Sequence, residues 1–242
     1  MINDRHSFIG IKQIIRYEWM QKTTYLMLAG LDAEGIRYEL DTLLEERGAT
    51  AKNQIISILM NTWPTKDPKL IPFRNNALAL LRDKPSEAFP VQWAMISACY
   101  PFWFNVARHI GRLLSLQNQA THAQIVSRLK ENYGDRETVS RYARYTIRSF
   151  HDWGVLNDTS TKGSYEKATP LSITNPTTAC ILLESALLAS SEERGNLSVL
   201  LSHPSFFPFA LPTLSGSLIS QSSERIDVVR YGLDDELLRL KP

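Results

Sequence analysis

The sequence predicts a mainly α-helical protein in three parts: a helical domain over residues 1–90, a helix-turn-helix with a small β-hairpin over 91–170, and a mixed C-terminal extension over 171–242. Apolar residues recur at helical spacing through the first hundred residues, without the alternation typical of strands. A capping motif and a glycine then delimit two successive helices, and two strand-like runs flank a turn-rich loop. Prolines and serines become frequent towards the C-terminus, which indicates irregular chain packed on the rest.

Five short helices are expected in the first hundred residues. In the first, Ile11, Ile15 and Trp19 lie on one face, and Asp32 is a typical N-cap residue for the second. Pro64 would stop the third, because proline cannot continue a helix. The expected helices run from Ile11 towards Gly30, from Asp32 to Gly48, from Thr50 to Trp63, onward from Pro72, and over residues 91–100.

Residues 121–153 carry the pattern of two helices joined by a short turn. Thr121 and Gln124 form a capping box, in which each side chain satisfies a backbone amide at the start of a helix. Gly134 would end that helix, and Asp135 would cap the next one. A turn of only a few residues between two helices is typical of a helix-turn-helix unit.

The second of these helices, expected over residues 136–153, has two distinct faces. At about 100° per residue, Arg141, Arg144 and Arg148 fall within about 60° of one another, and Tyr145 flanks them. We call these three arginines the arginine stripe. The opposite face is apolar and would pack on a core; it holds Val139, Tyr142, Ala143, Thr146, Ile147 and Phe150.

The segment after this helix has the pattern of a β-hairpin. Gly154 suits a left-handed C-cap, Val155 and Leu156 can begin a strand, and residues 165–168 can form the returning strand. The residues between them, NDTSTKGS, form a turn-rich loop with Lys162 near its tip. Helix, turn, longer helix, strand, basic loop and strand is the order found in winged-helix proteins. The sequence resembles that superfamily in RETVSRYARYTIRSFHDWGVL followed by NDTSTKGSYEKA.

The C-terminal extension is expected to mix helix, strand and irregular chain. Asn175 and Pro176 are typical of a helix start. Residues 203–212, HPSFFPFALP, would lie as an irregular segment over apolar surface; we call them the aromatic strap. Residues 225–231 alternate as in a short strand, and residues 234–240 would form a last helical turn.

The resemblance and the placement of charge together predict binding of double-stranded DNA. Residues 121–170 contain eight basic and six acidic residues, and they account for the whole net charge of +2. Arginine suits both phosphate oxygens and guanine edges in the major groove. The residues expected to bind DNA are Arg136, Arg141, Arg144, Tyr145, Arg148 and Lys162.

Two other interpretations of the same segment stay open. An arginine-rich helix face can simply be solvated, and Glu137 and Asp152, which lie in or beside the arginine stripe, could pair with it. Winged helices also dock proteins, so the chain could instead be an interaction subunit that docks a larger partner. Its N-terminal helices or the aromatic strap, with Phe206, Phe207 and Phe209, would then make the contact. An exposed strap favours this interpretation and a buried one weakens it.

Patterns that indicate catalysis, cofactor binding or metal binding are absent from the sequence. Neither GxGxxG nor GxxxxGK[ST] occurs, and the five histidines lack metal-ligand spacing. We therefore expect no enzymatic activity, no cofactor and no metal. Cys99 and Cys180 form no spaced set, which favours a reducing, cytoplasmic location. The long uncharged stretches at 88–107 and 196–223 contain proline and polar residues, which argues against membrane insertion.

At the level of the whole chain, the sequence resembles the BrxA family of BREX phage-resistance systems. The segments that carry the resemblance are RYARYTIRSFHDWGVL and the lead-in helix PFWFNVARHIGRLL, within a chain that has a helical N-terminal half. The resemblance implies a non-enzymatic DNA-binding component of a prokaryotic phage-defence system, with other protein subunits of that system as partners. The chain departs from the family in an additional C-terminal segment after Ser202.

Overall fold

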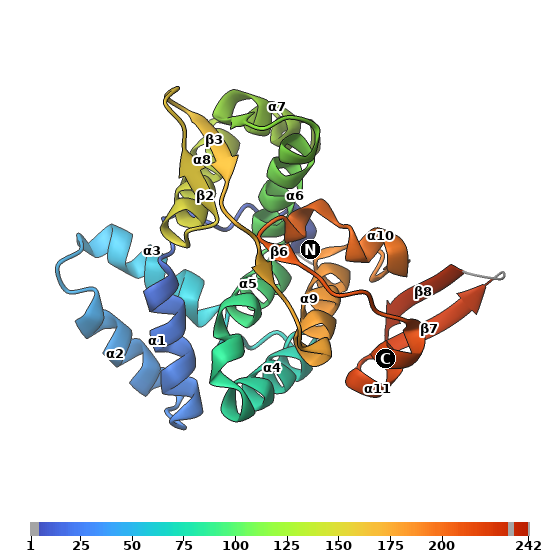
Figure 1. Cartoon of the computed structure of the whole chain (residues 1–242). Helices are drawn as coiled ribbons and strands as arrows, with labels where there is room; N and C mark the ends of the chain where they lie inside the picture. The colour runs from blue at the N-terminus through green and yellow to red at the C-terminus, as the bar shows by residue number, and fades with distance from the viewer. Residues whose placement is uncertain (1–4, 232–234, 242) are drawn as a thin grey trace.

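The computed structural model describes residues 5–231 and 235–241, which fold into eleven α-helices and eight short strands (Figure 1). Helix predominates over strand, which confirms the prediction of a mainly α protein. Four helices form the N-terminal region, and Asp32 caps the second by accepting a hydrogen bond from the Gly35 amide. They are α1 (Tyr17–Leu28), α2 (Ala33–Leu43), α3 (Ala49–Met60) and α4 (Ile71–Asp83).

The first helix begins later than the sequence predicts. Residues 11–16 are not helical, because the backbone of Ile15 is bonded to side chains of a distant helix instead. Its N–H donates to Ser149 Oγ (2.9 Å) and its carbonyl accepts from Trp153 Nε1 (2.9 Å). The third helix also ends early, at Met60 rather than Trp63, since a residue that precedes proline is disfavoured in the helical conformation.

Three helices form the centre of the molecule: α5 (Ala88–Cys99) and α9 (Pro176–Ala189), which are apolar on all sides, and the amphipathic α6 (Pro101–Leu116). α9 lies along α5 (Figure 1), and every residue of α9 from Thr178 to Ala189 is buried. Asn175 caps α9 by accepting from the Thr177 amide, as its Asn-Pro start predicts. A helix that is apolar on all sides can only sit inside a protein, so α9 is the axis on which the other elements pack.

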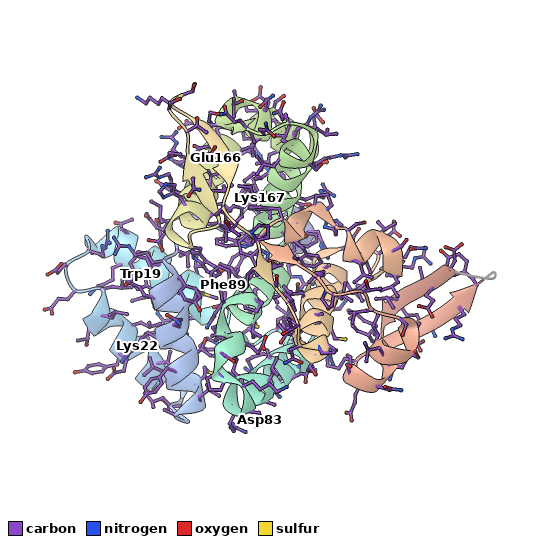
Figure 2. All side chains as sticks on the ribbon, in the orientation of Figure 1. Trp19, Lys22, Asp83, Phe89, Glu166 and Lys167 are labelled. Atoms are coloured by element: carbon purple, nitrogen blue, oxygen red, sulfur yellow. The ribbon has the colours of Figure 1, made fainter. Side chains whose placement is uncertain are left out.

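Aromatic side chains from all three predicted parts meet at this centre. The ring of Phe89 lies 5.2 Å from Tyr17, 6.0 Å from Trp153 and 6.0 Å from Phe209, measured between centroids. Figure 2 shows Phe89 near the middle of the molecule. Such tilted and edge-on ring pairs stabilise a core beyond the area that they bury. The buried apolar residues form one cluster that runs from Ile9 to Leu238.

The elements from α6 to residue 167 form the upper part of the molecule in Figure 1. After α6 the chain forms β1 (Ala120–Thr121), α7 (His122–Tyr133), α8 (Glu137–Asp152), β2 (Leu156–Asp158) and β3 (Ser164–Lys167). β3 lies between β1 and β2 and pairs antiparallel with both. The two helices and the hairpin agree with the sequence prediction to within a residue or two, whereas β1 was not predicted.

The C-terminal extension contains two further small sheets. β4 (Leu171–Ser172) pairs parallel with β6 (Phe209–Ala210). β5 (Arg194–Asn196), β7 (Ile226–Tyr231) and β8 (Asp235–Leu240) form an antiparallel sheet with β8 in the middle. Two short helices, α10 (Leu197–Leu201) and α11 (Gly216–Ser222), complete the extension. The prediction of a strand at 225–231 is confirmed by β7.

The prediction of a helical turn over 234–240 is wrong. Residues 235–240 are strand β8, and residue 234 lies outside the described residues. Glu236, Leu238 and Leu240 alternate along the strand, and Leu238 is fully buried. Pairing with both β5 and β7 satisfies the backbone of β8 on both edges, and this tertiary contact overrides the helical propensity of the segment.

The aromatic strap packs over α6, as expected, but it is not irregular throughout: Pro204–Phe206 form a 3-10 turn and Phe209–Ala210 form strand β6, which pairs with β4. Phe206 and Phe209 are buried, and Phe207 is half-buried. The approach is so close that a Cβ atom at Gly111 of α6 would lie 1.9 Å from the carbonyl oxygen of Pro204, so only glycine fits there. The buried strap is a poor docking surface, which weakens the interpretation that the chain contacts a partner through it.

Candidate nucleic-acid interface

Local signals in the sequence set the turn between α7 and α8. The capping box of Thr121 and Gln124 is formed, and Gly134 adopts a φ of 81°, a conformation that glycine accepts readily. Asp135 does not cap α8, contrary to the sequence prediction. Its carboxylate pairs with Lys130 (2.6 Å) instead, and the N-cap residue of α8 is Arg136, which makes no side-chain cap.

α8 buries one face and exposes the other. Its buried side chains are those of Val139, Ala143, Thr146, Ile147, Ser149 and Phe150. Arg141, Arg144 and Arg148 are all exposed, so the arginine stripe lies on the solvent side of the helix as its spacing predicts. Tyr145 is half-buried and its ring stacks on Tyr142, 6.4 Å between centroids, while the Arg141 guanidinium lies 5.5 Å from the centre of the Tyr142 ring. These contacts limit the freedom of Arg141 but leave its charge uncompensated.

Within the arginine stripe, Arg148 has a carboxylate partner. Arg148 Nη1 lies 3.1 Å from Asp158 Oδ2 on β2, and His151 Nε2 lies 3.2 Å from the same oxygen. The partner is therefore neither Glu137 nor Asp152, the two carboxylates that the helix spacing suggests. Asp152 is engaged elsewhere: its Oδ2 accepts from the Tyr17 amide (3.1 Å). Arg148 therefore presents less net positive charge than the other two arginines.

A groove of about 740 Å³ separates α8 from the loop of the β2–β3 hairpin. In the described part of the chain, neither the guanidinium of Arg144 nor the ammonium of Lys162 has an ion-pair or hydrogen-bond partner, and both are exposed. Three cationic side chains and one carboxylate line the groove, so its net charge is positive. Its lining residues are His122, Arg144, Arg148, Asp158, Thr159, Ser160, Thr161, Lys162, Gly163 and Tyr165.

His122, which sequence reasoning did not identify, forms part of the groove wall. The His122 amide donates to the Gly163 carbonyl (2.8 Å), which ties the hairpin loop to the start of α7. Its Nε2 is buried without a hydrogen-bond partner. Burial and, to a smaller extent, the positive charge of Arg144 lower the pKa of His122. The imidazole is therefore neutral at pH 7 and adds no charge to the groove.

Arg136 contributes differently from the other predicted DNA-binding residues. It is exposed, but its Nη2 donates to the Tyr133 carbonyl (2.8 Å) at the end of α7. This hydrogen bond binds a carbonyl at the C-terminal end of α7 and holds the turn together. The structure thus brings Arg144, Arg148 and Lys162 around one groove, with Arg141 and Tyr145 on the adjoining surface of α8 and Arg136 at its start.

Asp158 was also missed by sequence reasoning, although the sequence holds a signal for it. A strand that leaves a helix at a tight turn such as that at Gly154 (φ 70°) runs back along the helix. A carboxylate four residues after that turn can then reach the last turns of the helix. The Arg148–Asp158 pair follows from this reversal.

Comparison with known proteins found no relative of this chain. No protein-family model, no curated protein and no solved structure matches the chain. Among residues 5–231 and 235–241, no group of three or more His, Cys, Asp or Glu side chains gathers as a metal site would require. Within the same residues, no helix has the length and apolar character needed to cross a membrane.

Proposed function

We propose that residues 91–170 form a winged helix that binds double-stranded DNA, with α8 as its recognition helix and the β2–β3 hairpin as its wing. The observation that carries the proposal is that Arg141 and Arg144 on α8 have no carboxylate partner in the described chain and lie next to a hairpin whose loop carries Lys162. The order of helices and strands, and the position of β3 between β1 and β2, are those of winged-helix proteins. DNA phosphates would neutralise charges that nothing in the described chain compensates.

The described contacts assign different roles to the arginines. Arg144 and Arg141 are free to reach phosphates or guanine edges, because neither is held by a carboxylate. Arg148 shares its charge with Asp158, so it would contribute less. Lys162, on the loop, would contact the sugar-phosphate backbone, and Arg136 and Tyr145 would support the register of α8. In a phage-defence system of the kind that the BrxA resemblance implies, such a component would bind DNA without modifying it.

Duplex binding by a double variant tests the proposal. Arg141→Ala/Arg144→Ala should weaken binding of a short duplex about 10- to 100-fold at moderate salt, as expected for two lost phosphate contacts. The slope of log Kd against log salt should also fall by about two. Fluorescence anisotropy at several salt concentrations measures both quantities on the full chain.

A matched control variant removes the same number of positive charges from a surface outside the groove. Arg37→Ala/Arg82→Ala removes two exposed arginines from α2 and α4 and should leave duplex binding nearly unchanged. Thermal melts of both variants should agree with the parent, since exposed side chains contribute little to stability. If the stripe variant binds duplex as tightly as the control, α8 is not the DNA-binding element.

The alternative function is docking of a larger protein. Because the aromatic strap is buried, the N-terminal helices are the remaining candidate for the contact surface. Tyr25 on α1 and Tyr38 on α2 are 67% and 72% exposed, and they are the large side chains that a partner would cover. An apolar contact of this kind loses little affinity as salt rises, whereas DNA binding loses much. The salt titration therefore separates the two functions.

A further inference from the structure

A second positively charged hollow is lined by elements other than α8 and the β2–β3 hairpin. It has a volume of about 530 Å³ and lies where the N-terminal turn (Arg5–Ser7), α6, the end of α9 and α10 meet (Figure 1). Arg108, Arg194 and His203 line it, together with hydrogen-bonding side chains such as Asn132 and Ser190. Among the residues that the structure describes, none of those lining it is acidic.

Arg108 is the central group of this hollow. It is half-buried on α6, and in the described chain its guanidinium makes no hydrogen bond and no ion pair. Burial is the main reason that the pKa of Arg108 is lowered, and the opposing contribution of Tyr133 does not offset it. A half-buried guanidinium of this kind costs free energy in the empty state, and an anion would recover that cost.

Burial and the positive charge of Arg108 keep the two histidines beside it neutral near pH 7. Burial and the charge of Arg108 lower the pKa of His203 to about 4. Burial, Arg108, Arg128 and Arg112 lower the pKa of His109, on the other side of Arg108, also to about 4. Arg194 pairs only at 3.5 Å with Glu192, and both of those side chains are well exposed. The field inside the hollow therefore favours a negative charge.

The rest of the wall provides an apolar and an aromatic surface. Val199 and Leu200 of α10 and Ala186 of α9 line one side. The His203 ring stacks on Phe104 with centroids 4.9 Å apart and planes 18° apart, which places a flat surface in the wall. A volume of this size holds a small organic molecule rather than a single inorganic ion.

We propose that this hollow binds an organic phosphate of mononucleotide size, with its phosphate against Arg108 and Arg194 and its ring system against the His203 wall. Two guanidinium groups flanked by hydroxyl donors such as that of Ser190 match the several oxygens of a phosphate. The site is independent of the proposed DNA interface, because it shares none of its lining residues with the groove beside α8.

Isothermal titration of the full chain with adenosine 5′-monophosphate, inorganic phosphate and adenosine tests the site at constant ionic strength. The monophosphate should bind, adenosine should bind more weakly, and inorganic phosphate should compete for the same site. Arg108→Gln should weaken binding of the monophosphate about tenfold or more, because a charge-assisted hydrogen bond is lost. Arg112→Gln is the control: this exposed arginine on the next turn of α6 does not line the hollow, and its loss should change affinity less than about twofold.

Three results would overturn the proposal: no saturable binding of the monophosphate or of phosphate at millimolar concentration, equal affinity of Arg108→Gln and the parent, or equal losses in both variants. If Arg108→Gln does not fold, the exposed Arg194→Gln variant carries the same expectation of weaker binding. A short duplex added as competitor shows whether the phosphate bound in the hollow comes from a free nucleotide or from DNA. Displacement of the monophosphate by duplex, with duplex binding that depends on Arg108, would assign the hollow to DNA and contradict the proposal.

Discussion

α8 and α9 are similar in length, with 16 and 14 residues, but they differ in what surrounds them. α9 is buried along its whole length from Thr178, and its one charged residue, Glu184, is buried with it. α8 buries one face and turns three arginines to solvent on the other. Every side of α9 contributes to stability, whereas the exposed side of α8 contributes almost nothing to it. The composition of that exposed side is therefore free to serve another purpose.

The largest effect that separates the two helices should come from a core substitution in α9. Leu183→Ala removes a fully buried side chain and should lower the free energy of unfolding by about 3 to 4 kcal/mol. Arg144→Ala, on the exposed face of α8, should change it by less than about 0.5 kcal/mol. Denaturant unfolding of both variants measures the difference. If both variants lost a similar free energy of unfolding, the arginine stripe would have a structural role and the difference between α8 and α9 would not hold.

A smaller, pH-dependent effect should come from the ion pair that α9 buries. Glu184 is 1% exposed and accepts a hydrogen bond from Arg225 Nε, so Arg225→Ala leaves a buried carboxylate without a partner. Because the Arg225 side chain is 24% exposed, water replaces part of the lost contact, and we expect a loss of about 2 kcal/mol near pH 8.

The sign of the pH dependence follows from the pKa of Glu184. Burial raises that pKa and Arg225 lowers it, so the variant has the higher value. A carboxyl whose pKa is higher in the folded than in the unfolded state favours folding at low pH, and that contribution is lost as the pH rises through the folded-state pKa. The deficit of Arg225→Ala relative to the parent should therefore be smaller near about pH 5 than near about pH 8. A deficit that stays constant or grows towards low pH would contradict this account of Glu184.

The smallest expected effect lies on the exposed side of α8. Asp158→Asn releases Arg148 from its carboxylate and should strengthen duplex binding about threefold at low salt. The control for the change in net charge is Asp41→Asn. It breaks the ion pair between Asp41 on α2 and Lys52 on α3, both of which lie outside the candidate interface. Anisotropy titrations compare the two variants. A gain of equal size in both would show that the effect comes from net charge and not from Arg148.

The elements of the candidate interface were largely predictable because their signals are local. The Thr121–Gln124 capping box, the glycines at 134 and 154, and the two-sided pattern of α8 each act within a few residues. The exposure of the arginine stripe follows from the same periodicity. Strand β8 was not predictable in this way, since an acidic start followed by DELLRL suits a helix until pairing with β5 and β7 is known.

Contacts between distant segments explain what the sequence analysis missed. Arg148 meets Asp158 only after the chain reverses at Gly154, and residues 11–16 stay extended because side chains of α8 bind their backbone. The Arg108 hollow joins residues from the N-terminal turn, α6, α7, α9 and α10, which no spacing pattern connects. Each of these depends on tertiary structure that single-sequence patterns do not encode.

The hydrogen bonds around Ile15 have a mechanical consequence for the proposed complex. Ser149, Asp152 and Trp153, at the end of α8, hold the backbone of the chain just before and at the start of α1. These hydrogen bonds fix the start of α1 to the end of α8, so the orientation of α1 depends on that of α8. On a duplex, the angle at which α8 enters the major groove of the DNA would fix the direction in which the N-terminal helices project. Anything attached to those helices would then stand at a set distance and rotational phase along the DNA axis.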